Sequence, residues 1–215
     1  MYKLIIMKKL ITLLLFLCPL LSLSQNNDID SYFYEIAYRS EFNDKIYTKK
    51  WNEDIKIFIS DYKSDLNYND SLIDVIDSLK IELIRIVDDL NNYIDPINLT
   101  IVNDSTDSNF FIYFGSSEWF NMNVPQTKPY TKSNFGLAWV TVSNNIISKS
   151  EVYVDLHRIS TTKEKRHLLR EEITQSLGLL NDSYKYPSSI FYQGWTDVTE
   201  YSDIDIALIK KLYNE

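Results

Sequence analysis

The sequence predicts an α/β (α+β) domain, in which a mixed, twisted sheet packs on a long helix and on a second, motif-bearing helix, with a further helix at the C-terminal end. Three observations lead to this class. Apolar residues recur at helical spacing over residues 72–90, and short runs rich in β-branched and aromatic residues lie on both sides of that segment. Sixteen tyrosines and ten phenylalanines, against four glycines and five prolines, indicate a packed core.

Local signals define the individual elements along the chain. Asp30 or Ser31 caps a first helix, and Trp51 leads into a β-like run at residues 55–59. The polar residues 69–71 begin the longest helix, which ends near Pro96 because proline disfavours helical backbone before it. The remaining predictions are strands at 97–102, 110–114, 136–142 and 152–156, a helix capped within 160–162, and a last helix at 202–213.

The N-terminal residues have the composition of a secretory signal peptide. Lys8 and Lys9 precede an apolar run at 10–17, and small residues follow at 22–24. The apolar run is shorter than the about 20 residues of a membrane-spanning helix. We therefore expect residues 1–24 to be a signal peptide, 25–50 an N-terminal helical extension and 51–215 a single domain. The mature chain would be periplasmic or extracellular, without a transmembrane segment. Lipid anchoring is less favoured, because no small residues precede Cys18.

Charge and composition exclude several classes of function. The chain has 22 basic and 30 acidic residues, a net charge of −8, and such a surface repels phosphate backbones, so we expect no nucleic-acid partner. Its one cysteine lies in the expected signal peptide, which leaves no thiol for catalysis or disulfides. No Gly-rich phosphate loop or GxSxG elbow is present.

The stretch HLLREEITQSLGLLND, residues 167–182, has the frame HExxHxxGxxH of a zinc peptidase without its histidines. In that motif two histidines four apart hold the metal, and the glutamate between them takes a proton from metal-bound water. Here Glu171, Gln175 and Asn181 replace the histidines, while Glu172 and Gly178 keep the general-base and turn positions. A carboxylate can bind zinc, whereas an amide oxygen is a poor zinc ligand.

The order of motifs further along the chain resembles metzincins of the matrixin kind. Residues 189–192, Ser-Ile-Phe-Tyr, lie where those enzymes have a Ser-Ile-Met-Tyr turn beneath the metal, with Phe191 in the methionine's place. The segment 202–213 resembles their final helix, which ends in Leu-Tyr, and residues 136–138 and 152–156 resemble strands that flank their cleft. The resemblance implies a zincin/metzincin-like fold.

The chain resembles more closely a family of bacterial secreted proteins and lipoproteins defined as a domain of unknown function. The residues that match the family pattern are Glu171, Glu172, Thr174, Gln175, Leu177, Gly178, Asn181, Asp182, Ser189, Ile190, Phe191, Asp205, Leu212 and Tyr213, with Trp51 before the first strand. Members of this family resemble zinc peptidases in fold and lack the HExxH histidines. The resemblance implies a fold and an export route, but no established reaction.

Each motif also has a structural interpretation. Glu171 and Glu172 could be solvated charges paired with Arg166 or Arg170. Gln175 and Thr174 could instead form a buried hydrogen-bond network that replaces a metal and holds the helix to the sheet. The aromatic-rich run 119–122, expected as a loop, is typical of core packing, although beside a cleft it could grip an extended chain.

Two hypotheses for function follow. The first is a secreted, non-catalytic pseudopeptidase that needs no cofactor, whose cleft either is structural or binds an extended peptide or a protein by adding a strand to the sheet edge. Its cleft and motif residues are Glu171, Thr174, Gln175, Gly178, Asn181, Asp182 and Phe191.

The alternative is a metal-dependent hydrolase, though not an ordinary zinc peptidase. Glu172 would be its general base, at an oxygen-rich site for a divalent metal such as calcium, magnesium or manganese. The candidate ligands are Glu171, Gln175, Asp182 and His167. Because His167, Glu171 and Gln175 extend over two helical turns, one ion could not bind all three, and a ligand from elsewhere, Asp182, Asn181 or His157, would be required.

Overall fold

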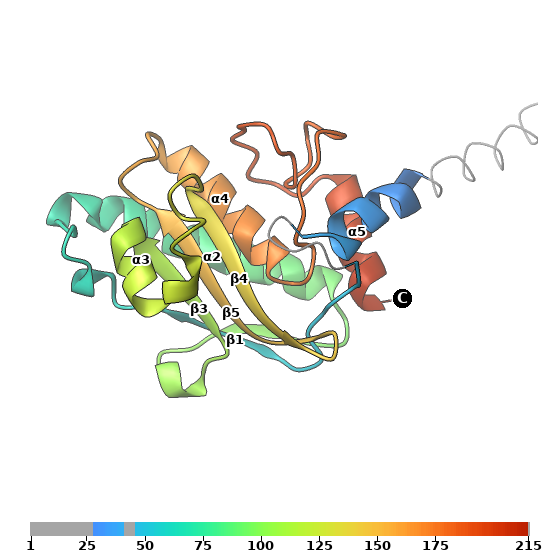
Figure 1. Ribbon diagram of the computed structural model, residues 1–215, viewed down its shortest axis with the longest axis horizontal. Helices are drawn as coiled ribbons and strands as arrows, with labels where there is room; N and C mark the ends of the chain where they lie inside the picture. Colours follow the sequence, from blue (N-terminus) through green and yellow to red (C-terminus); the bar gives the residue numbers. More distant parts are fainter. Residues whose placement is uncertain (1–27, 41–45, 215) are drawn as a thin grey trace, which may run out of the picture.

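The computed structural model describes residues 28–40 and 46–214 of the chain, so the expected signal peptide, residues 1–24, lies outside the described part. Within that part, no helix is both long enough and apolar enough to cross a membrane. The described residues form one layered domain, with helices on both faces of a central sheet (Figure 1).

The sheet has five strands in the spatial order β2-β1-β3-β5-β4. The neighbouring pairs β1–β2, β1–β3 and β3–β5 are parallel, and only β4 runs antiparallel to its neighbour β5. The mixed α/β class is therefore confirmed. The strands are β1 (Ile55–Ile59), β2 (Leu99–Ile101), β3 (Phe110–Gly115), β4 (Gly136–Ser143) and β5 (Ile146–Asp155).

A tight turn makes β4 the antiparallel edge strand. Asn144 and Asn145, between β4 and β5, both have positive φ, 51° and 66°, as a two-residue type I′ turn requires. Asparagine tolerates this left-handed backbone better than most residues. The turn folds β4 back along β5, so that Gly136 pairs with Val154 at the far end of the hairpin.

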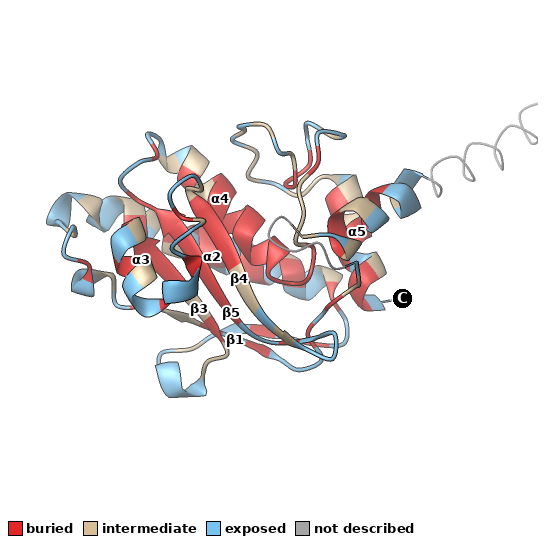
Figure 2. Ribbon diagram, viewed as in Figure 1, coloured by how far each residue is buried: buried red, intermediate tan, exposed pale blue. Residues whose placement is uncertain are grey.

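Two long helices cover one face of the sheet. In α2 (Ile73–Tyr93) the buried residues recur at helical spacing, and they pack with α4 (Thr162–Gln175) against the buried side chains of that face. The burial-coloured view shows α4 almost entirely buried (Figure 2). Thr161 begins α4 with a capping box, in which its hydroxyl accepts from the backbone N–H of Glu164 and the Glu164 carboxylate accepts from the backbone N–H of Thr161.

A buried ion pair joins α4 to α2. Arg170, 1% exposed, donates to Glu82 through Nη2 at 2.8 Å and to Asp89 through Nη1 at 2.6 Å. Arg166 donates to the Ser78 hydroxyl. The suggested pairing of these arginines with the neighbouring glutamates of the motif is thus not what the structure has, because both arginines lie on the α2 side of the helix.

The opposite face of the sheet carries the short helix α3 (Ser117–Asn123), in the segment expected as a loop. Trp119 and Phe120 are buried and form a second apolar cluster with Tyr113 and Tyr153 of the sheet. Ser116 supplies the cap, since its hydroxyl accepts from the backbone N–H of Trp119. The structure therefore shows core packing for the larger aromatic residues of this run.

Helices from the two ends of the described chain complete the core. Residues 28–38 are helical, and Tyr32, Ile36 and Ala37 of this helix are fully buried in the main cluster. The Tyr32 hydroxyl is 2.9 Å from that of Ser189. The C-terminal helix α5 (Asp203–Asn214) lies beside the helix of residues 28–38 (Figure 1), and both contribute to the cluster that contains α4.

Candidate functional site

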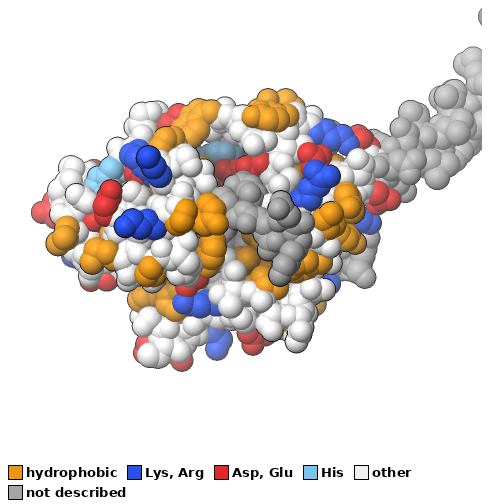
Figure 3. Space-filling view, in the orientation of Figure 1, with side chains coloured by type: hydrophobic (Ala, Val, Ile, Leu, Met, Phe, Trp, Pro, Cys, Tyr) orange, Lys and Arg blue, Asp and Glu red, His pale blue; other side chains and the backbone are white. Residues whose placement is uncertain are grey.

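A pocket of about 280 Å³ lies between α4, the start of β4 with the residues before it, and the segment 182–196. In the space-filling view, acidic side chains gather beside a histidine in a hollow of the displayed face (Figure 3). The lining residues are Ser133, Asn134, Phe135, Gly136, Glu164, His167, Leu168, Glu171, Glu172, Gln175, Asp182, Tyr192, Gln193, Gly194, Trp195 and Thr196.

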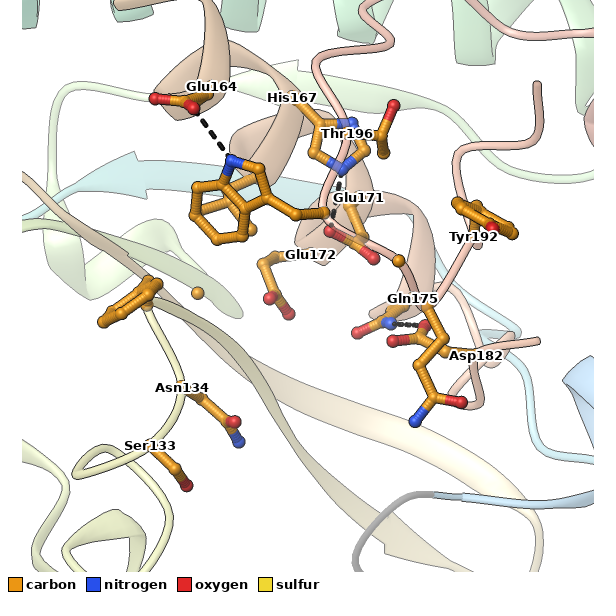
Figure 4. Close-up of a pocket in the computed structure, with 16 residues that line it drawn as sticks. Ser133, Asn134, Glu164, His167, Glu171, Glu172, Gln175, Asp182, Tyr192 and Thr196 are labelled. Atoms are coloured by element: carbon orange, nitrogen blue, oxygen red, sulfur yellow. Dashed lines mark hydrogen bonds and ion pairs between the residues drawn. The ribbon is translucent and has the colours of Figure 1, made fainter. Parts of the chain in front are cut away.

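Helical spacing brings His167, Glu171 and Gln175 to one wall of the pocket, as the sequence predicts. Figure 4 shows these side chains and Glu172 projecting from α4, opposite Ser133 and Asn134. All four α4 residues are at most 7% exposed. One polar wall of the pocket is thus built by α4, while polar residues within 133–134 and 182–196 line the rest.

His167 and Glu171 form a pair within this wall. His167 Nδ1 lies 2.6 Å from the carbonyl oxygen of Val198, and Nε2 lies 3.3 Å from Oε2 of Glu171. Since a carbonyl only accepts, Nδ1 donates to Val198. Burial disfavours a charged imidazole, but the hydrogen bond and negative charge of Glu171, with the Val198 carbonyl, outweigh it and raise the pKa of His167 above its ordinary value.

A second pair links the C-terminal end of α4 to the following segment. Gln175 Nε2 donates to Oδ1 of Asp182 at 2.7 Å. Thr174 points elsewhere: its hydroxyl donates to the carbonyl of Arg170 at 2.6 Å and lies 2.8 Å from the Tyr201 hydroxyl. The suggested network is therefore split, with Gln175 in the pocket and Thr174 on the side of α4 that faces away from it.

The Glu172 side chain lies directly over Gly136 at the start of β4. A Cβ atom on Gly136 would be 2.4 Å from Oε1 and 3.0 Å from Cγ of Glu172, much closer than atoms pack. The glycine thus provides the space in which the carboxylate sits. Sequence reasoning placed Gly136 in a strand but did not connect it with the motif helix.

The other motif residues support the pocket from outside. Gly178 has a φ of 117°, and a Cβ there would meet the Lys49 carbonyl oxygen at 1.9 Å, so the sharp turn and the close backbone contact both require glycine. Phe191 is fully buried in the main core, and Asn181 lines a neighbouring pocket together with Asp182 and Arg39.

Buried hydrogen bonds fix the turn at residues 189–191 and the end of α4. Asp205 of α5 accepts from the Ser189 hydroxyl at 2.5 Å and from the Ile190 backbone N–H at 3.2 Å. Burial raises the pKa of Asp205, although these hydrogen bonds oppose the rise. The Tyr213 hydroxyl donates to the Leu177 carbonyl at 2.7 Å, and Trp51 Nε1 donates to that of Ser176 at 2.9 Å.

Aromatic side chains form the mouth of the pocket. Trp195 is 60% exposed, yet its Nε1 donates to Glu164 Oε1 at 2.8 Å and its ring meets Phe135 edge-on, with 5.6 Å between centroids. The hydrogen bond from Trp195, with those from Thr161, lowers the pKa of Glu164 to about 2. The sequence analysis did not identify Phe135, Glu164 or Trp195 as site residues. Their only local signal was the pair Gly194-Trp195 in a polar segment.

The four candidate ligands test whether the site fits a metal. His167, Glu171, Gln175 and Asp182 all line the pocket, but they form two separate pairs. Among residues 28–40 and 46–214, no group of three or more His, Cys, Asp or Glu side chains is placed to hold a metal ion. His157 lies near Asp65 and lines a different pocket. The four side chains are thus held by one another in two pairs and are not gathered around one point.

Comparisons with known proteins give a family and similar solved structures. The family described as "Protein of unknown function (DUF2927)" matches residues 26–215. Among solved structures, the fold is similar to that of myroilysin, a metalloprotease, with a TM-score of 0.44 and 11% identity over 77% of this chain and 82% of that chain. No curated protein matches the sequence.

Proposed function

We propose that this chain, which belongs to the DUF2927 family of proteins of unknown function, is an exported protein that binds an extended peptide along β4 without cleaving it. One observation carries the proposal. β4 is one of the two edge strands of the sheet, and its first residue, Gly136, lines the polar pocket. A peptide that adds a strand to this edge would therefore place a side chain at the pocket.

The hydrogen-bond register of β4 identifies the groups that such a peptide would use. The Asp155 backbone N–H donates to the Phe135 carbonyl, which makes 135 and 155 a hydrogen-bonded pair just before β4. Because paired positions alternate in an antiparallel ladder, residues 137 and 139 also bond to β5, whereas Ala138 and Val140 direct their N–H and C=O groups to the outer edge. In the described part of the chain, no strand pairs with that edge.

The contacts within the pocket favour binding over hydrolysis. His167 is oriented by Val198 and Glu171, and Gln175 is held by Asp182. These bonds fix Glu171 and Gln175, which occupy two of the positions where a zinc peptidase has metal ligands. A pocket held by its own hydrogen bonds has no need of a metal to keep its shape.

Export is supported by the sequence alone. The basic start, apolar run and small residues within 1–24 are the features of a signal peptide, and the acidic composition suits a protein outside the cytoplasm that does not contact nucleic acid. We propose a periplasmic or extracellular location. N-terminal sequencing of the protein secreted by its host would test it, and an uncleaved N-terminus would contradict it.

The test of peptide binding uses residues 25–215 and a peptide library scored by isothermal titration calorimetry. Ala138→Pro removes one outward N–H while leaving the bonds to β5 intact, because proline is tolerated where a strand's N–H faces solvent. We expect peptide affinity to fall about tenfold, equivalent to about 1.4 kcal/mol. Unchanged affinity for every bound peptide would exclude strand addition.

The hydrolase alternative is tested on the same samples. Mass spectrometry of each peptide after incubation with zinc, manganese, calcium or chelator should show no cleavage. Cleavage that requires a metal and disappears in Glu172→Gln would establish the hydrolase and refute the non-catalytic proposal.

A further inference from the structure

We propose that the side chain of Asn91 closes the β2 edge of the sheet and thereby confines strand addition to β4. In the described part of the chain the sheet has two edge strands, β2 and β4. The inference deepens the proposed function, since it names the residue that selects between the two edges. It rests on the proposed function for the peptide at β4, whereas the closure of β2 concerns the protein alone.

The bonds between β2 and β1 show which residues of β2 face outward. The carbonyl of Asn98 accepts from β1 and the N–H of Val102 donates to β1, each at 2.8 Å. Because the N–H and C=O groups of successive residues in a strand point to opposite sides, Thr100 also faces β1. Leu99 and Ile101 therefore direct their N–H and C=O groups away from β1. Outward groups of this kind are a template on which another extended chain can pair.

Asn91, in the last turn of α2, is hydrogen-bonded to both outward groups of Leu99. Its Nδ2 donates to the Leu99 carbonyl oxygen at 3.0 Å, and its Oδ1 accepts from the Leu99 N–H at 2.8 Å. A carboxamide has the same donor and acceptor groups as a peptide unit, so Asn91 takes the place of a residue in a neighbouring strand. An added chain could bond to Leu99 only after displacing this side chain.

The closure leaves β2 with a single outward residue for an added strand, Ile101. Beyond it the chain leaves the sheet for the short 3-10 helix η3 (Ser105–Asp107). One bonded residue gains too little to offset the conformational entropy that a free peptide loses on ordering. β4 instead directs two residues outward, Ala138 and Val140. Without the Asn91 side chain, β2 would present the same number of outward residues as β4.

A side chain that only tied α2 to β2 would predict a different result. The loss of such a tie would lower the free energy of unfolding without giving β2 a new partner. The loss of a closing side chain would in addition let β2 bind an extended peptide. Asn92→Ala is the matched control, because Asn92 is the next residue of α2 and is also exposed.

The experiment maps where an extended peptide contacts the sheet. The probe is a hexapeptide of alternating threonine and valine, which favour extended backbone, with a benzophenone at one end. After irradiation with residues 25–215, mass spectrometry locates the crosslinked residues. In the unmodified chain we expect crosslinks beside β4 and only background within residues 97–103. Asn91→Ala should raise the yield within 97–103 at least tenfold above that background, and Asn92→Ala should leave it unchanged.

A second variant and a second measurement guard against a loss of folding. In Asn91→Asp the carboxylate still accepts from the Leu99 N–H but cannot donate to its carbonyl, so we expect an increase smaller than that in Asn91→Ala. Amide hydrogen exchange of Leu99 should become faster in Asn91→Ala. Exchange in β3, at the centre of the sheet, should stay unchanged if the fold is kept.

The outcomes separate the closure from the proposed function. Strong crosslinking within residues 97–103 of the unmodified chain would overturn the closure. Faster exchange of Leu99 without new crosslinks at β2 in either Asn91 variant would also overturn it, because the contact would then be a tie alone. Absence of crosslinks beside β4 in every variant would refute strand addition at β4, while new crosslinks at β2 in Asn91→Ala would still establish the closure.

Discussion

Arg170→Ala should destabilise the fold far more than removal of an exposed charge, because it removes both guanidinium hydrogen bonds of a buried carboxylate and leaves it only the exposed Arg85, 3.7 Å away. Glu82, the main partner, is only 3% exposed, and both Arg170 Nε and Nη2 donate to its Oε1, at 3.2 and 2.8 Å. Asp89 is 33% exposed and can be hydrated instead, so we assign it little of the cost. Breaking a buried pair from one side costs about 3–5 kcal/mol.

The magnitude translates into a shift that is easily measured. For a domain of this size, about 1 kcal/mol corresponds to roughly 2–4 °C in melting temperature, so Arg170→Ala should lower it by about 6–20 °C. Urea unfolding at 25 °C, followed by circular dichroism, gives the free energy of unfolding directly. Peptide binding well below the melting temperature should persist, because Arg170 faces α2 and does not line the pocket.

Arg166→Ala is the matched control. Arg166 lies on the same helix and also contacts α2, but it is partly exposed and bonds to the neutral Ser78 hydroxyl. Its loss should cost about 1 kcal/mol or less. The double change Arg170→Leu with Glu82→Leu should recover most of the stability, since well-packed apolar side chains replace such pairs without penalty. Equal costs for Arg170→Ala and Arg166→Ala would refute the reasoning.

Three further predictions concern the site and its frame. Gly136→Ala should keep the fold, within about 1.5 kcal/mol in urea unfolding, because only the flexible Glu172 side chain must move; a much larger loss of stability would contradict this reasoning. Gly178→Ala should cost at least about 1–3 kcal/mol in urea unfolding, since it combines positive φ with a collision against the Lys49 carbonyl, and a melting temperature equal to that of the unchanged chain would refute this. Burial opposes the charge of Asp155, but hydrogen bonds from Tyr153, Arg158 and the backbone hold its pKa below the ordinary 3.8. Its contribution to stability is therefore complete above about pH 4 and is lost as the pH falls through the lowered pKa. Asp155→Asn should cost about 1–3 kcal/mol at pH 7 and reduce the loss of stability between pH 4 and lower pH, and an unchanged loss of stability in acid would contradict the assignment.

Much of the fold was predictable because local patterns and tertiary packing agree. The apolar spacing within residues 72–90 predicted α2, and the pair Asn144-Asn145 predicted the turn of the β4–β5 hairpin. β5 begins at Ile146, six residues before the predicted start, because its polar residues pair with β4 through their backbone and find partners elsewhere in the fold: the Ser150 hydroxyl, for example, contacts that of Ser176 at the end of α4. A polar run of this kind carries no strand signal on its own.

The candidate site was predictable only where a single helix builds it. Spacing along α4 predicted that His167, Glu171 and Gln175 share a face, and the structure places all three in the pocket. The mouth could not be derived, because Trp195 reaches its position through a bond to Glu164, 31 residues away in the sequence. Contacts of that range depend on the whole fold and leave no periodic trace.

The hydrogen bonds that tie α4 to the last helix also bear on the order of folding. The Tyr213 hydroxyl donates to the carbonyl of Leu177, and the Tyr32 hydroxyl is hydrogen-bonded to that of Ser189, 157 residues further along the chain. The segments that complete the core therefore come from opposite ends of the described chain. Such long-range closure is slow, because the entropy of a large loop must be lost before the contact forms. A nascent chain emerging residue by residue thus cannot complete this core until its final turns are synthesised.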